Sequence, residues 1–372
     1  MSRVAVVLAG GKGTRLRPLT DVVPKPLIPI AGRTIIDYII EWLKLNGFTK
    51  FIVVAKYLGE QIIDHFKHSS EVRAELLDSK DTADAVRLVA GEISEEHFLV
   101  SMGDVLCNAD FNAFYEYHVR RGDVATIALK EVDNPLPYGL ILIDGDSRIT
   151  LFTEKPKSIE LLILNTAHLK LRSKSLYSNL VNAGFYMFNW DILRVLEENN
   201  GLMDFGRHVF PYLLEEGYRV NGWIMGEAYW EDVGRVESLK KATWDLLDGS
   251  IAGYRPLGEE YSPGVYVGRR ARIDGTVIPP AYIGEEAVVE YGAVVGPYVS
   301  LEKGSIVKAG ARVSYSILWR NSLVGEGSAI HDSIIMNDAA VLRGVKVVHS
   351  IVGSFNIASA NLSEAVIEPR GG

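Results

Sequence analysis

The sequence predicts an α/β domain with a mostly parallel sheet, followed by a parallel β-helix. In residues 1–250, short apolar runs alternate with helical patterns, and this rhythm is typical of a parallel sheet covered by helices. From residue 264 the helical patterns vanish and aliphatic residues recur at every sixth position, which indicates a β-helix. We therefore predict one domain at residues 1–250, a linker at 251–263 and a second domain at 264–372.

Apolar runs and capping residues indicate the elements of the first domain. Three apolar runs predict buried strands, at residues 3–8, 51–55 and 98–102. Three polar residues precede helical patterns and predict N-caps: Thr34, Asp81 and Ser238. Ligands of such sheets bind outside the carboxyl ends of the strands. We therefore expect the loops at 10–25 and 103–108 to face one crevice.

The hexapeptide repeat of the second domain is regular from residue 283 to residue 313, and further units resume at Val324 and Ile330. Its inward aliphatic positions are Ile283, Val289, Val295, Leu301, Val307 and Val313. The residue four positions beyond each of them is usually small, as at Ala287 and Ala293, which suits a tight corner. Three such hexapeptides make one triangular coil, so that the repeat predicts a three-sided β-helix.

The loop behind the first strand carries the strongest functional signal. Gly10, Gly11 and Gly13 let backbone N–H groups turn toward a ligand and let that ligand approach closely. Arg15 and Lys25 add positive charge at the same place. The loop matches neither the P-loop nor the dinucleotide-binding fingerprint. It nevertheless predicts a site for a polyphosphate.

Two aspartates are candidate metal ligands. Gly103–Asp104 follows the third predicted strand, and Asp232 follows another apolar segment. Mg²⁺ prefers one or two carboxylates together with substrate oxygens, so Asp104 suits Mg²⁺ at a phosphate site. Considered alone, Asp104 also fits a turn-capping role.

The string from Leu8 to Pro26 resembles the signature of sugar-1-phosphate nucleotidyltransferases, which make nucleotide-sugars. Phe152–Pro156, Asn182–Phe188 and Tyr138–Gly139 are similar to further strings of that family. The resemblance implies a Rossmann-like nucleotidyltransferase domain at residues 4–247.

The resemblance also implies roles for individual residues. For the nucleotide, it implies binding by Leu8, Gly10, Gly11, Gly13, Thr14, Arg15, Lys25 and Thr82. For the sugar phosphate, it implies binding by Gly139, Glu154, Lys155 and Asn182. Asp104 and Asp232 would bind Mg²⁺, and Arg15, Lys25 and Lys155 would be catalytic.

Two features depart from the family's pattern. Asp81 stands where the family usually has a glycine that helps to read the base, which leaves the base preference open. Residues 157–181 are longer than the family's connection, and they fit either a surface insertion or a lid over the sugar site.

The second domain resembles the left-handed β-helix that follows many of these nucleotidyltransferase domains. We expect it to serve oligomerisation or regulation, in a homo-oligomer. Such β-helices also occur as acyltransferases with a histidine base. His331 and His349 are the candidates here, and both lie inside repeat units, which favours surface histidines.

Composition limits the classes of partner and compartment. The formal net charge of -8 argues against a nucleic-acid-binding protein. We find no run of 18 apolar residues that would predict a membrane span. A single cysteine, Cys107, and the lack of a signal-peptide pattern lead us to expect a cytoplasmic protein.

Residues 204–211 and 229–234 are most similar to mannose-1-phosphate guanylyltransferases. The expected substrates are therefore GTP and mannose-1-phosphate, and the product GDP-mannose. Glucose-1-phosphate thymidylyl- and uridylyltransferases share nearly all of these strings. A non-catalytic regulatory subunit of the same fold and a bifunctional enzyme with acetyltransfer in the β-helix are further alternatives.

Overall fold

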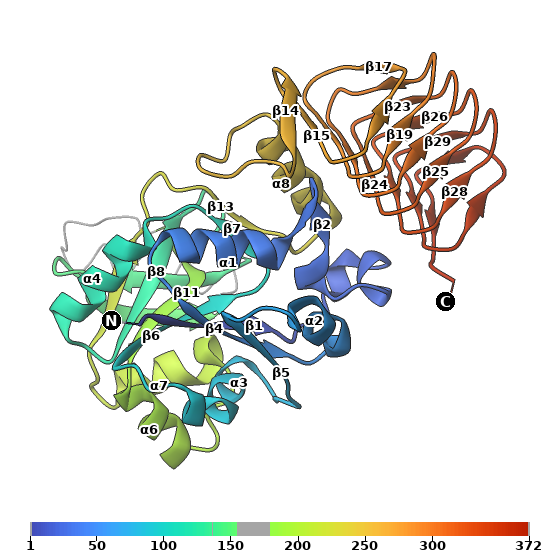
Figure 1. The fold of residues 1–372 in the computed structure, drawn as a ribbon. Coiled ribbons are helices and arrows are strands. Elements are labelled where there is room, and N and C mark those ends of the chain that lie inside the picture. Colours follow the sequence, from blue (N-terminus) through green and yellow to red (C-terminus); the bar gives the residue numbers. More distant parts are fainter. Residues whose placement is uncertain (1, 136, 155–178, 371–372) are drawn as a thin grey trace. The chain divides into compact units, whose positions relative to one another are not determined.

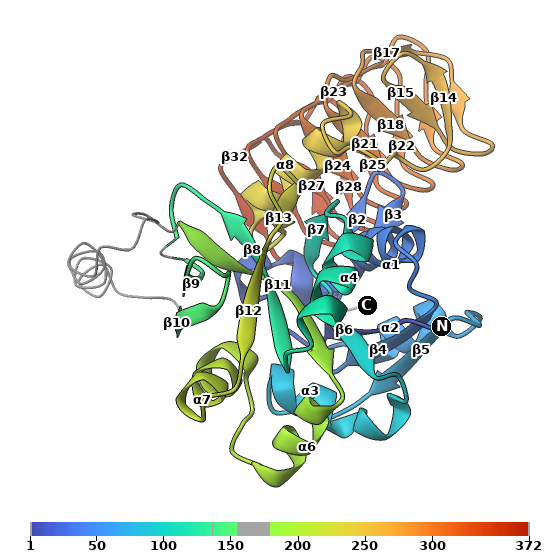
Figure 2. The same ribbon diagram turned by 90° about the vertical axis from the view of Figure 1, so that its left-hand side faces the viewer.

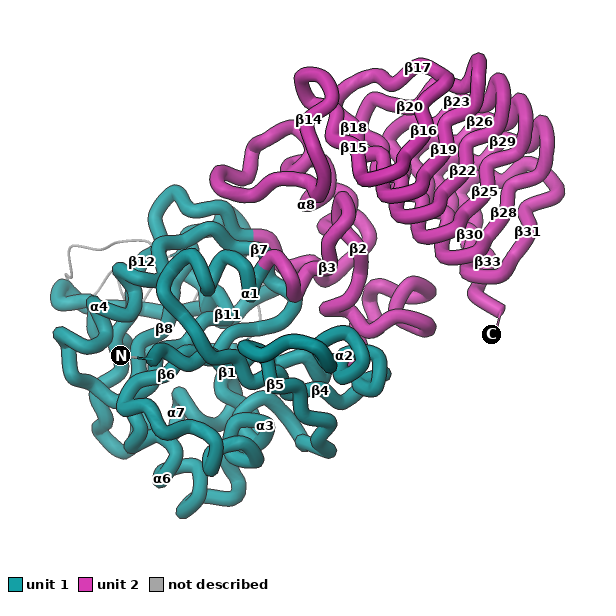
Figure 3. Tube along the Cα trace, viewed as in Figure 1, with its two compact units in different colours: residues 1–11, 39–230 teal, residues 12–38, 231–372 magenta. Residues whose placement is uncertain are grey.

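The computed structural model describes residues 2–135, 137–154 and 179–370. The chain divides into two compact units, which Figure 3 shows in different colours. Unit 1 comprises residues 1–11 and 39–230, and unit 2 comprises residues 12–38 and 231–372. The glycine-rich loop therefore begins in unit 1 and continues in unit 2. The domain limits expected from the sequence stay a prediction.

A sheet of nine strands among the described residues forms the centre of unit 1. β1 (Val4–Ala9) pairs in parallel with both β4 (Lys50–Ala55) and β6 (His97–Met102). These strands are the three that the apolar runs predict. The other strands are β5 (Val72–Leu76), β8 (Ala125–Glu131), β9 (Gly139–Ile143), β10 (Ile149–Glu154), β11 (Leu180–Asn189) and β12 (Val220–Ile224).

The strand order is β10–β9–β11–β6–β1–β4–β5, and β8 pairs with both β11 and β12. β4–β5 and β8–β12 are parallel pairs, whereas β11 is antiparallel to β6, β8 and β9. The predicted α/β fold with a mostly parallel sheet is confirmed. Two further short strands lie outside this sheet: β7 (Val105–Cys107) and β13 (Trp230–Asp232).

Helices cover both faces of this sheet (Figures 1 and 2). On one face, Phe98 and Phe188 join a buried cluster that includes Phe210. On the other face, the ring of Phe111 lies 4.8 Å from that of Phe185. Successive side chains of a strand point to opposite faces of the sheet. Phe185 and Phe188 are an odd number of positions apart in β11, so their rings lie on opposite faces. The helices up to residue 215 are α1 (Ile35–Leu45), α2 (Gly59–Phe66), α3 (Thr82–Leu88), α4 (Phe111–Arg121), α6 (Asp191–Glu198), the π-helix η5 (Phe205–Val209) and α7 (Phe210–Glu215).

Two of the three predicted N-caps are confirmed. The Thr34 hydroxyl accepts a hydrogen bond from the Asp37 N–H at 3.3 Å, where α1 begins. The Asp81 carboxylate accepts one from the Thr82 N–H at 2.9 Å, where α3 begins. The prediction for Ser238 is wrong, because α8 (Val236–Leu247) begins earlier. Ser238 is its third residue, and its hydroxyl accepts from the N–H of the capping residue, Arg235, at 3.0 Å.

The first segment of unit 2 is irregular. It contains three single 3₁₀ turns, η1 (Thr14–Leu16), η2 (Leu19–Asp21) and η3 (Lys25–Leu27). A two-stranded hairpin, β2 (Pro29–Ile30) and β3 (Arg33–Thr34), follows directly. One more 3₁₀ turn, η4 (Ala90–Glu92), lies in unit 1.

The predicted three-sided β-helix is confirmed in unit 2. Its short strands stack in three sheets, and every pair is parallel except the entering hairpin β14–β15. The predicted inward positions from Ile283 to Val313 are at most 1% exposed. The strands are β14 (Glu259–Ser262), β15 (Val265–Val267), β16 (Arg272–Ile273), β17 (Thr276–Val277), β18 (Ala281–Ile283), β19 (Val288–Val289), β20 (Val294–Val295), β21 (Val299–Leu301), β22 (Ile306–Val307), β23 (Arg312–Ser314), β24 (Ser316–Leu318), β25 (Leu323–Val324), β26 (Ala329–His331), β27 (Ile334–Ile335), β28 (Ala340–Val341), β29 (Lys346–Val348), β30 (Ile351–Val352), β31 (Ile357–Ala358), β32 (Leu362–Ser363) and β33 (Val366–Ile367).

Among the described residues, no helix combines the length and the apolar character that crossing a membrane requires.

Candidate active site

The glycine-rich loop closes on itself within unit 2. Gly13 has a left-handed backbone with φ of +59°. Its carbonyl accepts hydrogen bonds from the Leu16 N–H at 2.8 Å and from the Thr20 hydroxyl at 2.9 Å. A Cβ on Gly13 would lie 2.8 Å from Cγ2 of Thr20. The turn that starts η1 at Thr14 therefore requires glycine at this position.

Lys25 and Asp232 form the charged centre of this site in unit 2. The Lys25 Nζ lies 3.2 Å from Asp232 Oδ1, and Lys25 is only 6% exposed. The Arg15 Nη2 lies 3.9 Å from Asp232 Oδ2, and its side chain is 57% exposed. A Cβ on Gly234 would lie 2.9 Å from this Arg15 nitrogen. The residues thus bring a buried and an exposed cation to one carboxylate.

The carboxyl ends of β1 and β6 carry the candidates of unit 1. The Gly103 N–H donates to the Leu8 carbonyl at 2.9 Å, and a Cβ on Gly103 would lie 2.8 Å from the same oxygen. Only glycine permits this approach of two backbones. Asp104 follows directly, while Gly10 and Gly11 follow the end of β1. The structure therefore places these residues at one edge of the sheet.

Three of the four predicted sugar-binding residues meet elsewhere in unit 1. Gly139 opens β9, Glu154 closes β10, and the two residues are register partners. A Cβ on Gly139 would lie 2.8 Å from Glu154 Oε2 and 3.4 Å from Asn182 Cβ. The glycine thus leaves room for the carboxylate beside Asn182.

Asn182 is held in one orientation by its neighbours. Its amide nitrogen donates to the Tyr186 hydroxyl at 2.9 Å, and its amide oxygen accepts from the Gly184 N–H at 3.0 Å. Burial raises the pKa of Tyr186 above its ordinary value, so this hydroxyl stays neutral. The backbone at Gly184 is left-handed with φ of +82°, which a glycine adopts without strain.

Thr82 is already engaged by protein groups. Its hydroxyl donates to Asp204 Oδ2 at 3.1 Å and accepts from the Phe205 N–H at 3.0 Å. Beside it, burial and the charge of Asp204 raise the pKa of Asp81. The aspartate that replaces the family's glycine therefore caps a helix next to a second carboxylate.

Sequence reasoning did not assign Asp204 or Gly206 to the site. A Cβ on Gly206 would lie 2.8 Å from Glu154 Oε2, so Gly206 also borders the Glu154 carboxylate. The string that contains both residues is similar to guanylyltransferases, and the only signal in it for this role is a glycine two positions after an aspartate. Lys155 and the segment 157–178 lie outside the described residues.

The fit of a metal ion can be tested against the donor atoms. Among the described residues, no group of three or more His, Cys, Asp or Glu side chains gathers to hold a metal. Mg²⁺ does not require such a cage, because it binds one or two carboxylates and completes its shell with phosphate and water oxygens. Asp104 and Asp232 each fit that pattern. They belong to different units, so their joint role stays a prediction.

Two family models match the chain. The model described as nucleotidyl transferase matches residues 4–249, and the model described as GMPPB C-terminal domain matches residues 277–363. The first match covers more than half of the chain. The chain therefore belongs to the nucleotidyl transferase family.

Curated relatives named for different activities are similar to this chain over most of their length. A UTP–glucose-1-phosphate uridylyltransferase from Synechocystis sp. is 29% identical over 87% of this chain and 84% of its own. The bifunctional protein GlmU of Methanocaldococcus jannaschii is 30% identical over 96% of this chain and 80% of its own. The mannose-1-phosphate guanylyltransferase catalytic subunit beta of Drosophila pseudoobscura pseudoobscura is 30% identical over 76% of this chain and 70% of its own.

Proposed function

We propose that the protein transfers a nucleotidyl group from a nucleoside triphosphate to a hexose-1-phosphate and releases pyrophosphate. The observation that carries this proposal is the buried Lys25 beside Asp232, with Arg15 at the same carboxylate, behind the glycine-rich loop. Family membership supports it, as do the names of the relatives, which include sugar-1-phosphate uridylyl-, adenylyl- and guanylyltransferases.

The chemistry is an in-line displacement at the α-phosphorus. An oxygen of the sugar phosphate forms the new bond, and the bond between the α-phosphorus and the bridging oxygen of the leaving pyrophosphate breaks. No covalent intermediate on the protein is needed, so the protein positions the substrates and offsets charge. Two unit charges at 4 Å repel each other by about 4 kcal/mol at an effective dielectric constant of 20.

Each group has a defined task in this reaction. Arg15 and Lys25 hold the triphosphate and stabilise the charge that develops on pyrophosphate, and Lys155 holds the sugar phosphate. Glu154 and Asn182 bind sugar hydroxyls beside Gly139, while the backbone from Leu8 to Thr14 and Thr82 contact the nucleotide. Asp104 and Asp232 would hold Mg²⁺, whose charge lowers the repulsion between the two substrates when it is bound.

We propose GTP and mannose-1-phosphate as the substrates. The match of residues 277–363 to the GMPPB C-terminal domain and the guanylyltransferase relative support this choice. Glucose-1-phosphate with UTP or dTTP is the alternative, which the uridylyltransferase relative favours. We further propose that the protein is cytoplasmic and that the β-helix joins copies of the chain in a homo-oligomer.

The test is pyrophosphate release by the purified protein with Mg²⁺. GTP, UTP, dTTP and ATP are each combined with mannose-, glucose- and N-acetylglucosamine-1-phosphate. We expect the pair of GTP and mannose-1-phosphate to exceed every other pair. A different best pair would keep the reaction and overturn the proposed substrates. Release from no pair would favour the regulatory-subunit alternative.

Replacing Gly103 by alanine should lower kcat at least ~10-fold, since displaced charge-stabilising groups cost this much or more. The new Cβ would meet the Leu8 carbonyl at 2.8 Å and push Asp104 from its place. Gly91→Ala is the matched control, because a Cβ at Gly91 meets nothing within 4 Å. Steady-state kinetics with titrated Mg²⁺ measure the effect. Equal kinetics of both variants would remove Asp104 from the proposed metal site.

A further inference from the structure

A buried carboxylate in the β-helix has no role in the site described so far. Glu302 directly follows β21 and is 6% exposed. In the stacked coils, the residues at the same position are Gly268, Gly284, Trp319, Met336, Gly353 and Glu368. Only Glu368 among them carries a charge, and it is exposed, whereas Glu302 is buried. A charged side chain at this buried position is costly unless it has hydrogen-bond partners.

Glu302 has one hydrogen-bond partner in the hairpin β2–β3, which follows the Lys25 turn, and one in the preceding strand, β21. The Gly32 N–H donates to both carboxylate oxygens, at 3.3 Å to Oε1 and 3.1 Å to Oε2. The hydroxyl of buried Ser300 donates to Oε1 at 2.8 Å. Glu302 thus holds the turn of the hairpin by its backbone, and all of these residues belong to unit 2.

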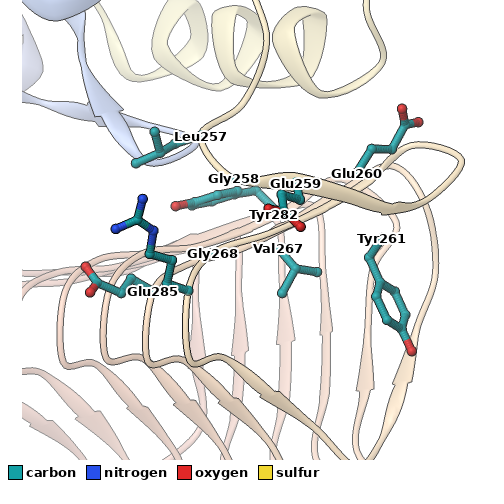
Figure 4. A pocket seen from close by; sticks show the side chains of 10 residues that line it. Leu257, Gly258, Glu259, Glu260, Tyr261, Val267, Gly268, Tyr282 and Glu285 are labelled. Carbon is teal, nitrogen blue, oxygen red and sulfur yellow. The ribbon is translucent and has the colours of Figure 1, made fainter.

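The turn is shaped to fit against the β-helix. Gly32 has a φ of +92°, and a Cβ there would overlap the Tyr282 hydroxyl and lie 2.6 Å from Leu257 Cβ. The Leu257 N–H donates to the Ala31 carbonyl at 3.0 Å. Figure 4 shows Tyr282 and Leu257 among the residues lining a pocket of about 830 Å³. The turn therefore packs closely on two residues that also line this pocket.

A short, buried stretch of chain connects this turn to Lys25. The Ile28 N–H donates to the Lys25 carbonyl at 3.2 Å, and the Ile35 N–H donates to the Ile28 carbonyl at 3.2 Å. Ile28 and Ile30 are fully buried, and the Tyr38 hydroxyl donates to the Ile30 carbonyl at 3.1 Å. A displacement of the turn at Gly32 would therefore be passed to Lys25 rather than absorbed by a flexible loop.

We propose that Glu302 is a positioning residue, which seats the turn at Gly32 and thereby fixes Lys25 for triphosphate binding. The β-helix would then set the geometry of the nucleotide site in addition to any role in assembly. The assignment rests on the proposed function for the part that concerns Lys25. The seating of the turn by Glu302 is independent of that function and can be measured by itself.

The protonation of Glu302 gives the proposal a distinctive pH dependence. Burial raises the pKa of Glu302 to about 7 in spite of its hydrogen bonds. If the turn lifts and water reaches the carboxyl group, its pKa falls to the ordinary ~4.3. The seated state therefore binds more protons, and a rising pH between these two values favours the lifted turn, about tenfold per pH unit.

Five other titratable groups lie around Glu302 and its neighbours. Burial raises the pKa of both tyrosines that face it, so they stay neutral. The charge of Arg33 opposes this effect, because it lowers the pKa of both tyrosines. Lys303 and Arg270 lower the pKa of Glu285, which lies near Tyr282, so Glu285 stays anionic. The two tyrosines are Tyr38 and Tyr282, and the remaining groups are Arg33, Glu285 and Asp37, the aspartate at the start of α1.

Hydrogen exchange of the full chain tests the seating of the turn. The protection factor of the Gly32 amide is measured at pH 5.5 and pH 8, after correction for intrinsic exchange. We expect wild-type protection to fall at least ~10-fold at the higher pH, by the linkage above, and Glu302→Gln to show no such fall. Glu326→Gln, an exposed glutamate of the same β-helix, should behave as wild type. Equal pH dependence in wild type and Glu302→Gln would overturn the proposal.

Kinetics test the link to Lys25 with the best substrate pair. At pH 8, Glu302→Gln should have a lower KM for the nucleoside triphosphate than wild type, and the difference should vanish at pH 5.5. Glu302→Ala should raise this KM at both pH values, because alanine cannot hold the turn. Glu302→Gln, which keeps a hydrogen-bond acceptor, should not show this rise. A pH-dependent turn without these changes in KM would show that seating does not position Lys25. Absence of pyrophosphate release from every pair would instead defeat the proposed function and leave the exchange result intact.

Discussion

Lys25→Met is expected to lower kcat at least ~100-fold, because loss of one preorganised charge-stabilising group costs about that much. Methionine keeps most of the aliphatic stem and removes only the ammonium group. That group is buried and lies 3.2 Å from Asp232, so that water cannot easily replace its charge. Arg15 lies farther from Asp232, at 3.9 Å, and is mostly exposed, and we expect it to compensate only in part.

Pyrophosphate release under saturating substrates measures this loss, and thermal unfolding of the same sample checks that the variant is folded. Lys67→Ala is the matched control, because Lys67 is an exposed lysine that pairs with Asp64. It should retain wild-type kcat. A loss of less than threefold in Lys25→Met would exclude Lys25 from the stabilisation of the leaving pyrophosphate.

Local sequence signals predicted those parts of the fold that depend on neighbours along the chain. Thr34 and Asp81 cap helices, because each has a partner within three residues. Ser238 shows the limit of such signals. Its hydroxyl bonds to the backbone of Arg235 from inside the helix, so a serine before an apolar run marks a helix start without fixing its first residue.

The site was predictable to the extent that backbone geometry selects glycine. Gly13 and Gly103 have no room for a side chain, and both lie in strings that the sequence marks as functional. The contribution of Gly206 depends on tertiary packing, which brings a residue from η5 beside a carboxylate at the end of β10. Thr82 likewise bonds to a partner that is 122 residues away in sequence.

The role of Glu302 could not be predicted from the sequence, for a physical reason. The hexapeptide repeat is recognised from its inward aliphatic residues, and Glu302 follows one of them, Leu301, at a position where the repeat imposes no single residue type. Its significance appears only when the coils are stacked, because the other buried residues at that position, Gly284, Trp319, Met336 and Gly353, are uncharged. Comparing equivalent positions of successive coils would therefore have singled it out.

Glu154→Gln is expected to raise the KM for the sugar phosphate ~10-fold to ~100-fold, because a hydrogen bond to a charged group contributes about 1.5–3 kcal/mol. The KM for the nucleoside triphosphate should change less than ~2-fold, because a substitution that does not touch this substrate has only a small effect on its binding. Glutamine has the same shape and removes only the charge. Glu131→Gln, at the exposed end of β8, is the matched control and should leave both KM values unchanged.

The neighbouring glycines provide an independent test of the same carboxylate. A Cβ on Gly139 or on Gly206 would lie 2.8 Å from Glu154 Oε2, so alanine at either position displaces the carboxylate without removing it. Both alanine variants should therefore reproduce the selective rise in the KM for the sugar phosphate. If Glu154→Gln and the two alanine variants affected the nucleotide and the sugar phosphate equally, Glu154 would act on the fold of the site rather than on the sugar. A selective effect in all three would place the hexose beside the ends of β9 and β10.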